Sequence, residues 1–120
     1  MSAIIKLFEA KSLLEQFFDE DIKNLDLNQD RRQLHIVLND GVEIYVIYNN
    51  HDEYGYSVIF SKLDLDRVRF DNYDKIWDTS SNPHHCHPRY KKEAISSNMK
   101  GDPKTDIPLL HKMIKSGILF

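Results

Sequence analysis

Residues 33–48 read QLHIVLNDGVEIYVIY and predict an antiparallel β-hairpin. Large apolar residues alternate with other residues along both halves, which is the two-residue period of a half-buried strand. Asn39-Asp40-Gly41 stands between the halves, and an Asp-Gly pair supplies the positive φ that a tight hairpin turn requires. The sequence therefore places an antiparallel sheet at the centre of the fold.

Three further strands are expected around this hairpin. A weaker apolar stretch precedes it, and two alternating stretches follow it, each bounded by polar or turn-forming residues. Together with the hairpin they form a meander of four or five antiparallel strands. The three additional strands are predicted at residues 22–27, 54–61 and 67–72.

Helices are predicted near both ends of the chain. Apolar residues at spacings of three and four indicate an amphipathic helix over residues 3–18, whose apolar side can cover one face of the sheet. Near the other end, Thr105-Asp106-Ile107-Pro108 is typical of a helix cap followed by proline in the first turn, and Gly117 is a typical stop. The expected fold is α+β: an N-terminal helix packed on a 4–5-stranded antiparallel meander, a long histidine-containing loop and a short C-terminal helix.

The length and composition bound the possible classes of protein. A chain of 120 residues, 41% hydrophobic and 29% charged, suits one globular domain spanning residues 1–120. No apolar run approaches the roughly 20 residues that cross a bilayer, so we expect no membrane partner. The single cysteine fits a reducing compartment, and we expect a cytoplasmic protein.

The charge is distributed unevenly along the chain. The net charge of −3 argues against nucleic-acid binding over the whole surface. Acidic residues nevertheless dominate residues 19–30, whereas basic residues dominate residues 84–115. A local basic region of this kind is compatible with an anionic ligand such as a phosphodiester.

Residues 71–90, DNYDKIWDTSSNPHHCHPRY, hold three of the six histidines, the only cysteine and the only tryptophan. Histidine gives and takes protons near neutral pH and, when neutral, is the commonest metal ligand. We expect a loop for about thirty residues past Asn72, because no regular period is visible and Ser80-Ser81-Asn82-Pro83 breaks regular structure. Trp77 is expected to be a core anchor that closes this loop onto the sheet.

Metal binding is one chemistry that the segment allows. His85 and His87 are two residues apart, so on an extended chain both can point the same way and chelate one ion. The remaining ligands of a transition metal would have to come from elsewhere in the fold. The candidates for them are His35, His51, Asp71, Asp74 and Asp78.

Metal-independent acid/base catalysis on RNA is a second chemistry. Cleavage next to a 2′-hydroxyl needs a base, an acid and a cation that holds the phosphate. The candidate catalytic residues are His84, His85 and His87, which would transfer the protons. The candidate substrate-binding residues that follow them are Arg89, Tyr90, Lys91 and Lys92, with Tyr90 stacking on a base.

Two other interpretations of the segment stay open. Cys86 would be a nucleophile if the fold supplied it with a base, although no partner stands out in the sequence. Alternatively, the histidines hydrogen-bond loop backbone and Cys86 is a small buried apolar residue. His35 and His111 are expected to be structural or to face solvent.

The order of these residues resembles the signature of the TumE family, small toxins of toxin–antitoxin systems. The similarity covers residues 67–114 and consists of Phe70-Asp71-Asn72, or alternatively Trp77-Asp78, then Asn82-Pro83-His84-His85, then His87. The family usually shows two histidine pairs, whereas here only His84-His85 with His87 remains and Cys86 takes the intervening place. The resemblance implies a toxin-like protein acting on RNA with a helix-turn-helix antitoxin as partner, and it adds Asp71 and Asn72 to the candidate substrate-binding residues.

The sequence thus favours a toxin-like protein with metal-independent ribonuclease activity. Two rival functions are a small metal-binding protein and a non-catalytic interaction module. In the second rival, a contact surface for a partner or for a homodimer would be formed by Tyr45, Tyr48, Tyr54 and Tyr56.

Overall fold

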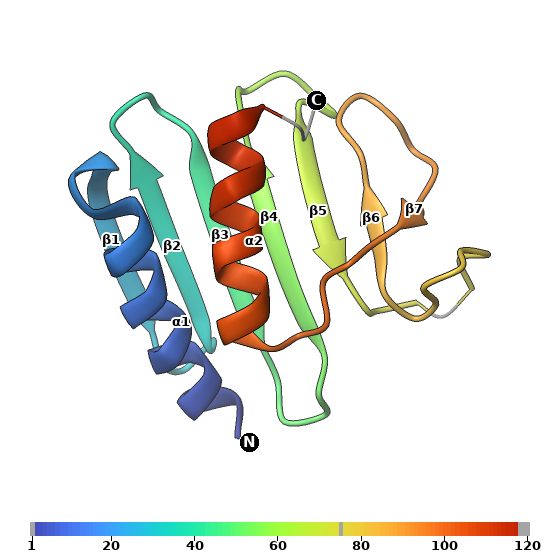
Figure 1. The fold of residues 1–120 in the computed structure, drawn as a ribbon, viewed down its shortest axis with the longest axis horizontal. Coiled ribbons are helices and arrows are strands. Elements are labelled where there is room, and N and C mark those ends of the chain that lie inside the picture. The colour runs from blue at the N-terminus through green and yellow to red at the C-terminus, as the bar shows by residue number, and fades with distance from the viewer. Residues whose placement is uncertain (1, 75, 118–120) are drawn as a thin grey trace.

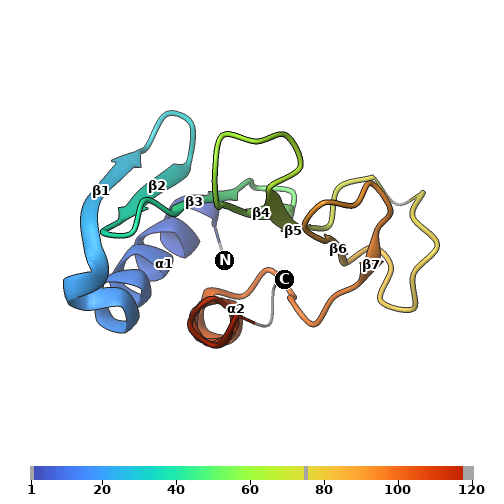
Figure 2. The same cartoon turned by 90° about the horizontal axis from the view of Figure 1, so that it is seen from above.

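The computed structural model describes residues 2–74 and 76–117, in which two α-helices lie on one face of a seven-stranded antiparallel sheet (Figures 1 and 2). Every strand pairs with its neighbours in chain order, so the sheet is a continuous meander. The predicted α+β class is confirmed, although the sheet has more strands than the expected four or five. The elements are α1 (Ala3–Phe18), a 3-10 turn (Asp19–Asp21), β1 (Ile22–Asn28), β2 (Gln33–Leu38), β3 (Glu43–Tyr48), β4 (Tyr54–Ile59), β5 (Arg67–Asp71), β6 (His85–His87), β7 (Ile95–Ser96) and α2 (Pro103–Ser116).

The two additional strands lie in the segment for which the sequence predicts only a loop. β6 pairs with the edge of β5, and β7 pairs with β6. The prediction of an irregular segment past Asn72 is therefore wrong for residues 85–87 and 95–96. Strands of two or three residues are too short to show a period, and they form because the edge of β5 offers unpaired backbone groups.

The main core lies between the helices and the sheet. α1 contributes Leu7, Ala10 and Leu14, and the facing side of the central strands contributes Ile36 and Ile44, all fully buried. Burying each such leucine or isoleucine contributes about 1.5–3 kcal/mol, so this layer supplies much of the driving force for folding. In the part of the chain that the structure describes, no helix has the length and apolar character needed to span a bilayer.

A buried chain of polar groups ties α2 to this layer. The Tyr48 and Tyr56 hydroxyls are 2.9 Å apart, and Tyr56 donates to Asp106 Oδ2 at 2.8 Å. The same carboxylate oxygen accepts the Gly101 N–H at 2.7 Å. Gly101 has a φ of +86°, and a Cβ there would lie 2.8 Å from Tyr54 Cδ1, so a side chain would be strained at this position.

This network corrects two sequence-based expectations. Tyr48, Tyr54 and Tyr56 are at most 1% exposed, so the predicted tyrosine contact surface is wrong, and only Tyr45 lies outside the core. α2 begins at Pro103, directly after Asp102 and earlier than its predicted cap, and Asp106 lies in its first turn as a buried hydrogen-bond acceptor. The predicted stop is confirmed, since Gly117 adopts the left-handed conformation directly after the helix.

Replacing Asp106 by alanine leaves Tyr56 and two backbone N–H groups without their acceptor in the core. Each stranded group costs about 1–3 kcal/mol, so we expect Asp106→Ala to lower the free energy of unfolding by about 3 kcal/mol or more. Urea unfolding followed by circular dichroism measures this loss. Lys112→Ala, an exposed change on the same helix, should stay within about 0.5 kcal/mol of the parent, and equal stability of the two variants would contradict the network.

Candidate functional site

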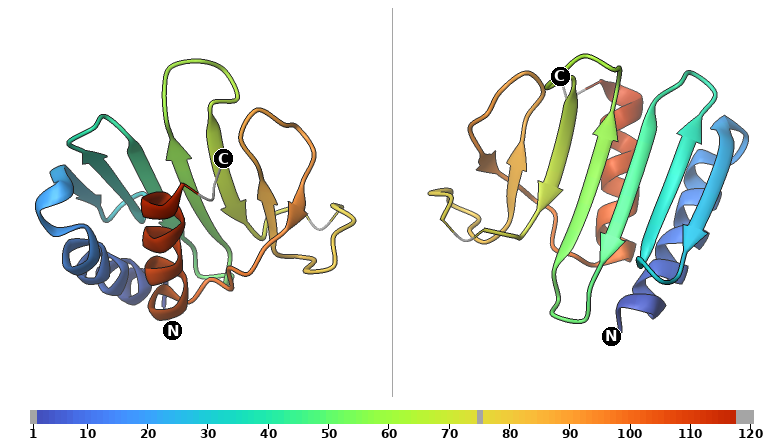
Figure 3. Two further views of the ribbon diagram at one scale, coloured as in Figure 1. Left: turned by 45° about the horizontal axis from the view of Figure 1, so that its top comes forward. Right: turned by 180° about the vertical axis from the view of Figure 1, so that it is seen from behind.

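One face of the sheet has no helix packed on it (Figure 3, right), and the strand pairing places the polar side chains of β5 and β6 on this face. Successive residues of a strand point to opposite faces. Phe70 pairs with Cys86, and both are buried towards the helices, so their neighbours point the other way. Those neighbours also pair across the two strands, Arg69 with His87 and Asp71 with His85. The helix-free face therefore brings two histidines, a carboxylate and a guanidinium together.

Cross-strand pairing extends this group into a row across the sheet. Residues directly opposite each other on adjacent strands share a face and lie close enough to contact. The row connects β6 with β1 along the helix-free face. Its members, in order, are His87, Arg69, Ser57, Tyr45, His35 and Asp26.

Asp71 is the best-buried charged residue of this group, with 3% of its surface exposed. Its Oδ2 accepts the Arg69 Nε–H at 2.7 Å, and its Oδ1 accepts the Tyr73 backbone N–H at 3.0 Å. His85 Nε2 lies 3.0 Å from the same Oδ1. A carboxylate removed from water needs such partners, and these three contacts fix its orientation.

His85 lies beside Asp71 and is 1% exposed. Its Nδ1 is 2.9 Å from the Pro83 carbonyl oxygen, so Nδ1 carries a proton and donates it to that acceptor. Its Nε2 faces the Asp71 carboxylate, which is also an acceptor. Both ring nitrogens of His85 therefore point at oxygen atoms that can only accept.

His87 connects this buried pair to solvent. Its ring is half-buried, and its centroid lies 4.8 Å from that of His85 and 5.1 Å from that of Trp77, both in edge-on contacts. Burial and the nearby His85 lower the pKa of His87, which favours a neutral imidazole with a free lone pair. Together with Arg69 and Tyr73, His87 lines an open cavity of about 450 Å³.

Asp71, His85 and His87 form the group with metal-ligand character in the described ranges 2–74 and 76–117. One ligand atom from each residue lies within 4.8 Å of those of the other two. Of the ligand candidates taken from the sequence, Asp71 thus joins His85 and His87. Asp74 only lines the same cavity, and His35 is hydrogen-bonded to Glu43 on β3.

The structure does not bring His84 to the other two histidines. Its Nδ1 lies 2.9 Å from the hydroxyl of Tyr54, whose ring is 1% exposed and packs on the helix side against Gly101. Adjacent residues of an extended chain point in opposite directions, so His84 and His85 turn to different faces. The candidate catalytic trio therefore reduces to His85 and His87, with Asp71 as the third member.

Two of the candidate substrate-binding residues have structural roles. Arg89 forms an ion pair with the buried Asp66, and its guanidinium lies 4.3 Å from the centroid of the Phe60 ring. Asn72 accepts the Tyr54 backbone N–H at 3.0 Å and donates to the Asp52 carbonyl at 2.9 Å, which holds the start of β4.

The other candidate binding residues stay accessible. Tyr90 is exposed beside Arg89, whose guanidinium lies 5.1 Å from the Tyr90 ring centroid. Lys91 and Lys92 are exposed and line a second cavity together with His87. Both lysines are therefore near enough to the site to act on an anionic ligand.

Two residues of the site were not predicted from the sequence. Arg69 precedes Asp71 by two positions on a predicted strand, so the same alternation places it on the face of Asp71. Tyr73 contacts Asp71 through its backbone, and the Arg69 guanidinium lies 5.7 Å from its ring centroid. Strand alternation in the sequence could have indicated Arg69, whereas no sequence pattern indicated that the loop would place Tyr73 at the site.

Trp77 holds the loop before β6 against this site. Its ring contacts His85 and His87 on the sheet, with centroid distances of 6.0 and 5.1 Å. The expected closure of the loop onto the sheet is confirmed, although Trp77 is only half-buried and lies outside the main core. Ser81 supports the same loop, because its hydroxyl oxygen accepts the Ser97 backbone N–H at 2.9 Å.

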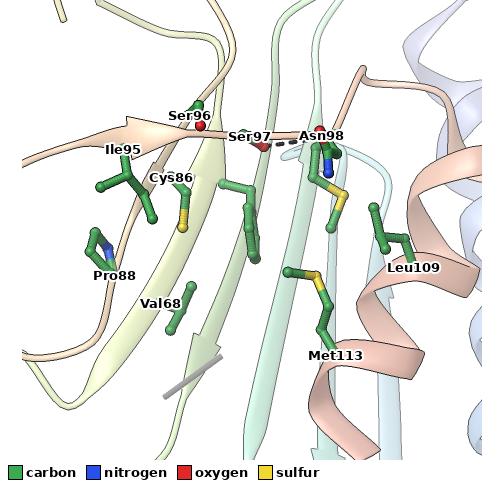
Figure 4. A pocket seen from close by; sticks show the side chains of 11 residues that line it. Val68, Cys86, Pro88, Ile95, Ser96, Ser97, Asn98, Leu109 and Met113 are labelled. Atoms are coloured by element: carbon green, nitrogen blue, oxygen red, sulfur yellow. Dashed lines mark hydrogen bonds between the residues drawn. The ribbon is translucent and has the colours of Figure 1, made fainter. Parts of the chain in front are cut away.

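Cys86 faces away from the site, into an apolar cavity of about 320 Å³ between β5, β6 and α2 (Figure 4). Among the lining residues, all within the described part of the chain, none is charged. Burial raises the pKa of the Cys86 thiol to about 12, so it stays protonated near neutral pH. These surroundings favour the interpretation of Cys86 as a small buried apolar residue.

Comparison with known proteins supplies no function for this chain, which is therefore inferred from the geometry of the site. No protein-family model matches the chain, and neither a curated protein nor a solved structure matches it significantly.

The environment of Cys86 predicts slow reaction with alkylating reagents. At pH 8 we expect iodoacetamide to label the folded chain at least about 100-fold more slowly than the urea-unfolded chain, since only the thiolate attacks. Mass spectrometry of timed samples measures both rates. Similar labelling rates in the two states would show an accessible, ionised thiol and would reopen the nucleophile hypothesis.

Proposed function

We propose that this chain is a toxin-like ribonuclease whose site is formed by Asp71, His85, His87 and Arg69. The proposal rests on one observation. The buried Asp71–His85 pair contacts the solvent-accessible His87, which lines an open cavity together with the Arg69 guanidinium. Buried ionisable groups that meet in a cavity are the usual setting of acid/base chemistry.

The proposed reaction is cleavage of RNA by its own 2′-hydroxyl. The 2′-oxygen attacks the adjacent phosphorus, the bond from phosphorus to the 5′-oxygen breaks, and the 5′-oxygen takes a proton from solvent. The proton of the 2′-hydroxyl must pass to His87 or to a water molecule that His87 holds, because His85 has almost no exposed surface. Arg69 supplies positive charge where the phosphate gains negative charge.

RNA suits the surroundings of the site better than a small anion does. Lys91 and Lys92 lie beside His87 and can contact neighbouring phosphates. Tyr45 lies on the same face of the sheet, and its ring stacks on His35 at a centroid distance of 4.3 Å. Single-stranded RNA is commonly recognised by aromatic rings on an open sheet face, on which its bases stack.

The toxin part of the proposal is supported by the resemblance of residues 67–114 to the TumE signature. Asp71, His85 and His87 belong to that signature and also meet in space. A helix-turn-helix antitoxin is the partner that the resemblance implies. We propose that such an antitoxin blocks the helix-free face while it is bound.

Removing the imidazole of His87 should abolish the proposed activity and spare the fold. We expect His87→Ala to reduce cleavage of a single-stranded RNA by at least about 100-fold and to relieve growth inhibition on expression. His51→Ala removes an exposed imidazole from the β3–β4 loop and serves as the matched control. Cleavage by the His87 variant at the rate of this control would contradict the proposal.

The two lysines beside His87 should contribute phosphate contacts. We expect Lys91→Ala with Lys92→Ala to weaken binding of a single-stranded RNA, and to reduce the slope of log affinity against log salt by about 1.4. Fluorescence anisotropy at several salt concentrations gives this slope. The paired control, Lys104→Ala with Lys112→Ala on α2, should leave the slope unchanged, and an equal decrease in both would indicate unspecific charge effects.

A further inference from the structure

We infer that Asp71, His85 and His87 bind one divalent transition-metal ion of the Zn²⁺ class, with an open coordination position towards the cavity of Arg69 and Tyr73. The inference deepens the proposed ribonuclease function and rests on that function only for the catalytic use of the ion. It differs from the metal-independent mechanism that the sequence favours.

The spacing of the three ligand atoms is close to what one bound ion requires. Zinc binds histidine nitrogen and carboxylate oxygen at about 2.0–2.2 Å, which places two ligand atoms of a tetrahedral ion about 3.4 Å apart. His85 Nε2 and Asp71 Oδ1 are 3.0 Å apart, and all three ligand atoms lie within 4.8 Å of one another. A movement of the His87 ring by about 1.4 Å would bring the most distant ligand atoms to this spacing around one ion.

The hydrogen bonding of His85 also favours a cation between His85 and Asp71. Because Nδ1 donates to the Pro83 carbonyl, a neutral ring has its lone pair on Nε2, directed at the Asp71 carboxylate. Two lone pairs 3.0 Å apart repel unless a proton or a metal cation lies between them. A cation bound by both atoms satisfies the buried carboxylate and the neutral imidazole together.

Outer contacts hold these ligands in the orientation that a metal requires. A metal-binding histidine commonly donates its other N–H to a backbone carbonyl, as His85 does to Pro83. The Asp71 carboxylate is likewise held by Arg69 Nε at 2.7 Å and by the Tyr73 N–H at 3.0 Å. The positions of His85 and Asp71 are therefore set by the fold before an ion binds.

The ligand types limit which ion fits. Two imidazoles with one carboxylate favour first-row transition ions, whereas Mg²⁺ and Ca²⁺ prefer oxygen ligands. Three protein ligands leave a position for water, as in catalytic sites and unlike closed structural zinc sites. Since His87 is the half-buried member, the open position faces the cavity.

The ion would supply the base for the proposed cleavage. A metal lowers the pKa of its bound water to near neutrality, so a bound hydroxide is available there. In place of His87, whose ring would then bind the ion, that hydroxide would take the proton of the 2′-hydroxyl and become bound water. The 2′-oxygen then displaces the 5′-oxygen from phosphorus, and the 5′-oxygen takes a proton from solvent, with no change of oxidation state.

Zinc titration of the untagged, metal-free chain tests the inference. We expect isothermal titration calorimetry with Zn²⁺ alone to give one ion per chain for the parent and for His51→Ala, and at least about 100-fold weaker binding for His87→Ala and Asp71→Asn. Circular dichroism checks the fold, and His87→Ala decides the result if Asp71→Asn is unfolded. Absence of binding by the parent, or parent-like binding by His87→Ala, would overturn the inference.

A cleavage assay separates this inference from the proposed function. Restored RNA cleavage when Zn²⁺ or Co²⁺ is returned to the metal-free chain would support both. Stoichiometric zinc binding that depends on His87, without RNA cleavage, would support the metal site and overturn the ribonuclease. Full cleavage by the metal-free chain in the presence of a chelator would overturn the catalytic use of the ion and leave the ribonuclease standing.

Discussion

The alternation of side chains along β5 and β6 is the constraint on which the site depends. An antiparallel pair keeps directly opposite residues on the same face. Phe70 and Cys86 therefore both point into the core under the helices, while Asp71 and His85 both point to the helix-free face. A one-residue slip between these strands would exchange the two faces. The apolar packing that fixes the register thereby also fixes the chemistry on the opposite side.

The buried carboxylate of Asp71 sets the electrostatics of this face. It accepts hydrogen bonds from Arg69 and from the Tyr73 backbone, and His85 Nε2 lies 3.0 Å from it, so the negative charge in the middle of the site has close partners around it. Leaving a buried charge unpaired costs several kcal/mol, which makes these contacts a condition of the fold. Because His85 is buried in these contacts, His87 is the histidine of this site that can contact a substrate.

Periodic parts of the fold were predictable from the sequence, and contacts between distant segments were not. The bounds of α1 and the hairpin around Asp40-Gly41 follow from local patterns, which are strong in long amphipathic elements. β6 was missed because a short strand acquires its conformation from its partner, β5. The burial of Tyr48, Tyr54 and Tyr56 was not predicted, because only the fold reveals the hydrogen-bond partners of their hydroxyl groups. Tyr54 pairs with His84, and the other two are linked to Asp106. For the site, the spacing of His85 and His87 was informative, whereas the opposite direction of His84 depends on the turn before β6.

The central claim is that His85 and His87 share one face with Trp77 while His84 lies on the other. Nuclear Overhauser contacts between aromatic ring protons in solution test it most directly. The account predicts contacts of the Trp77 indole with the His85 and His87 rings, and a separate contact between His84 and Tyr54. Contacts of the His84 ring with His85 or His87, or a Trp77 indole remote from both, would contradict it.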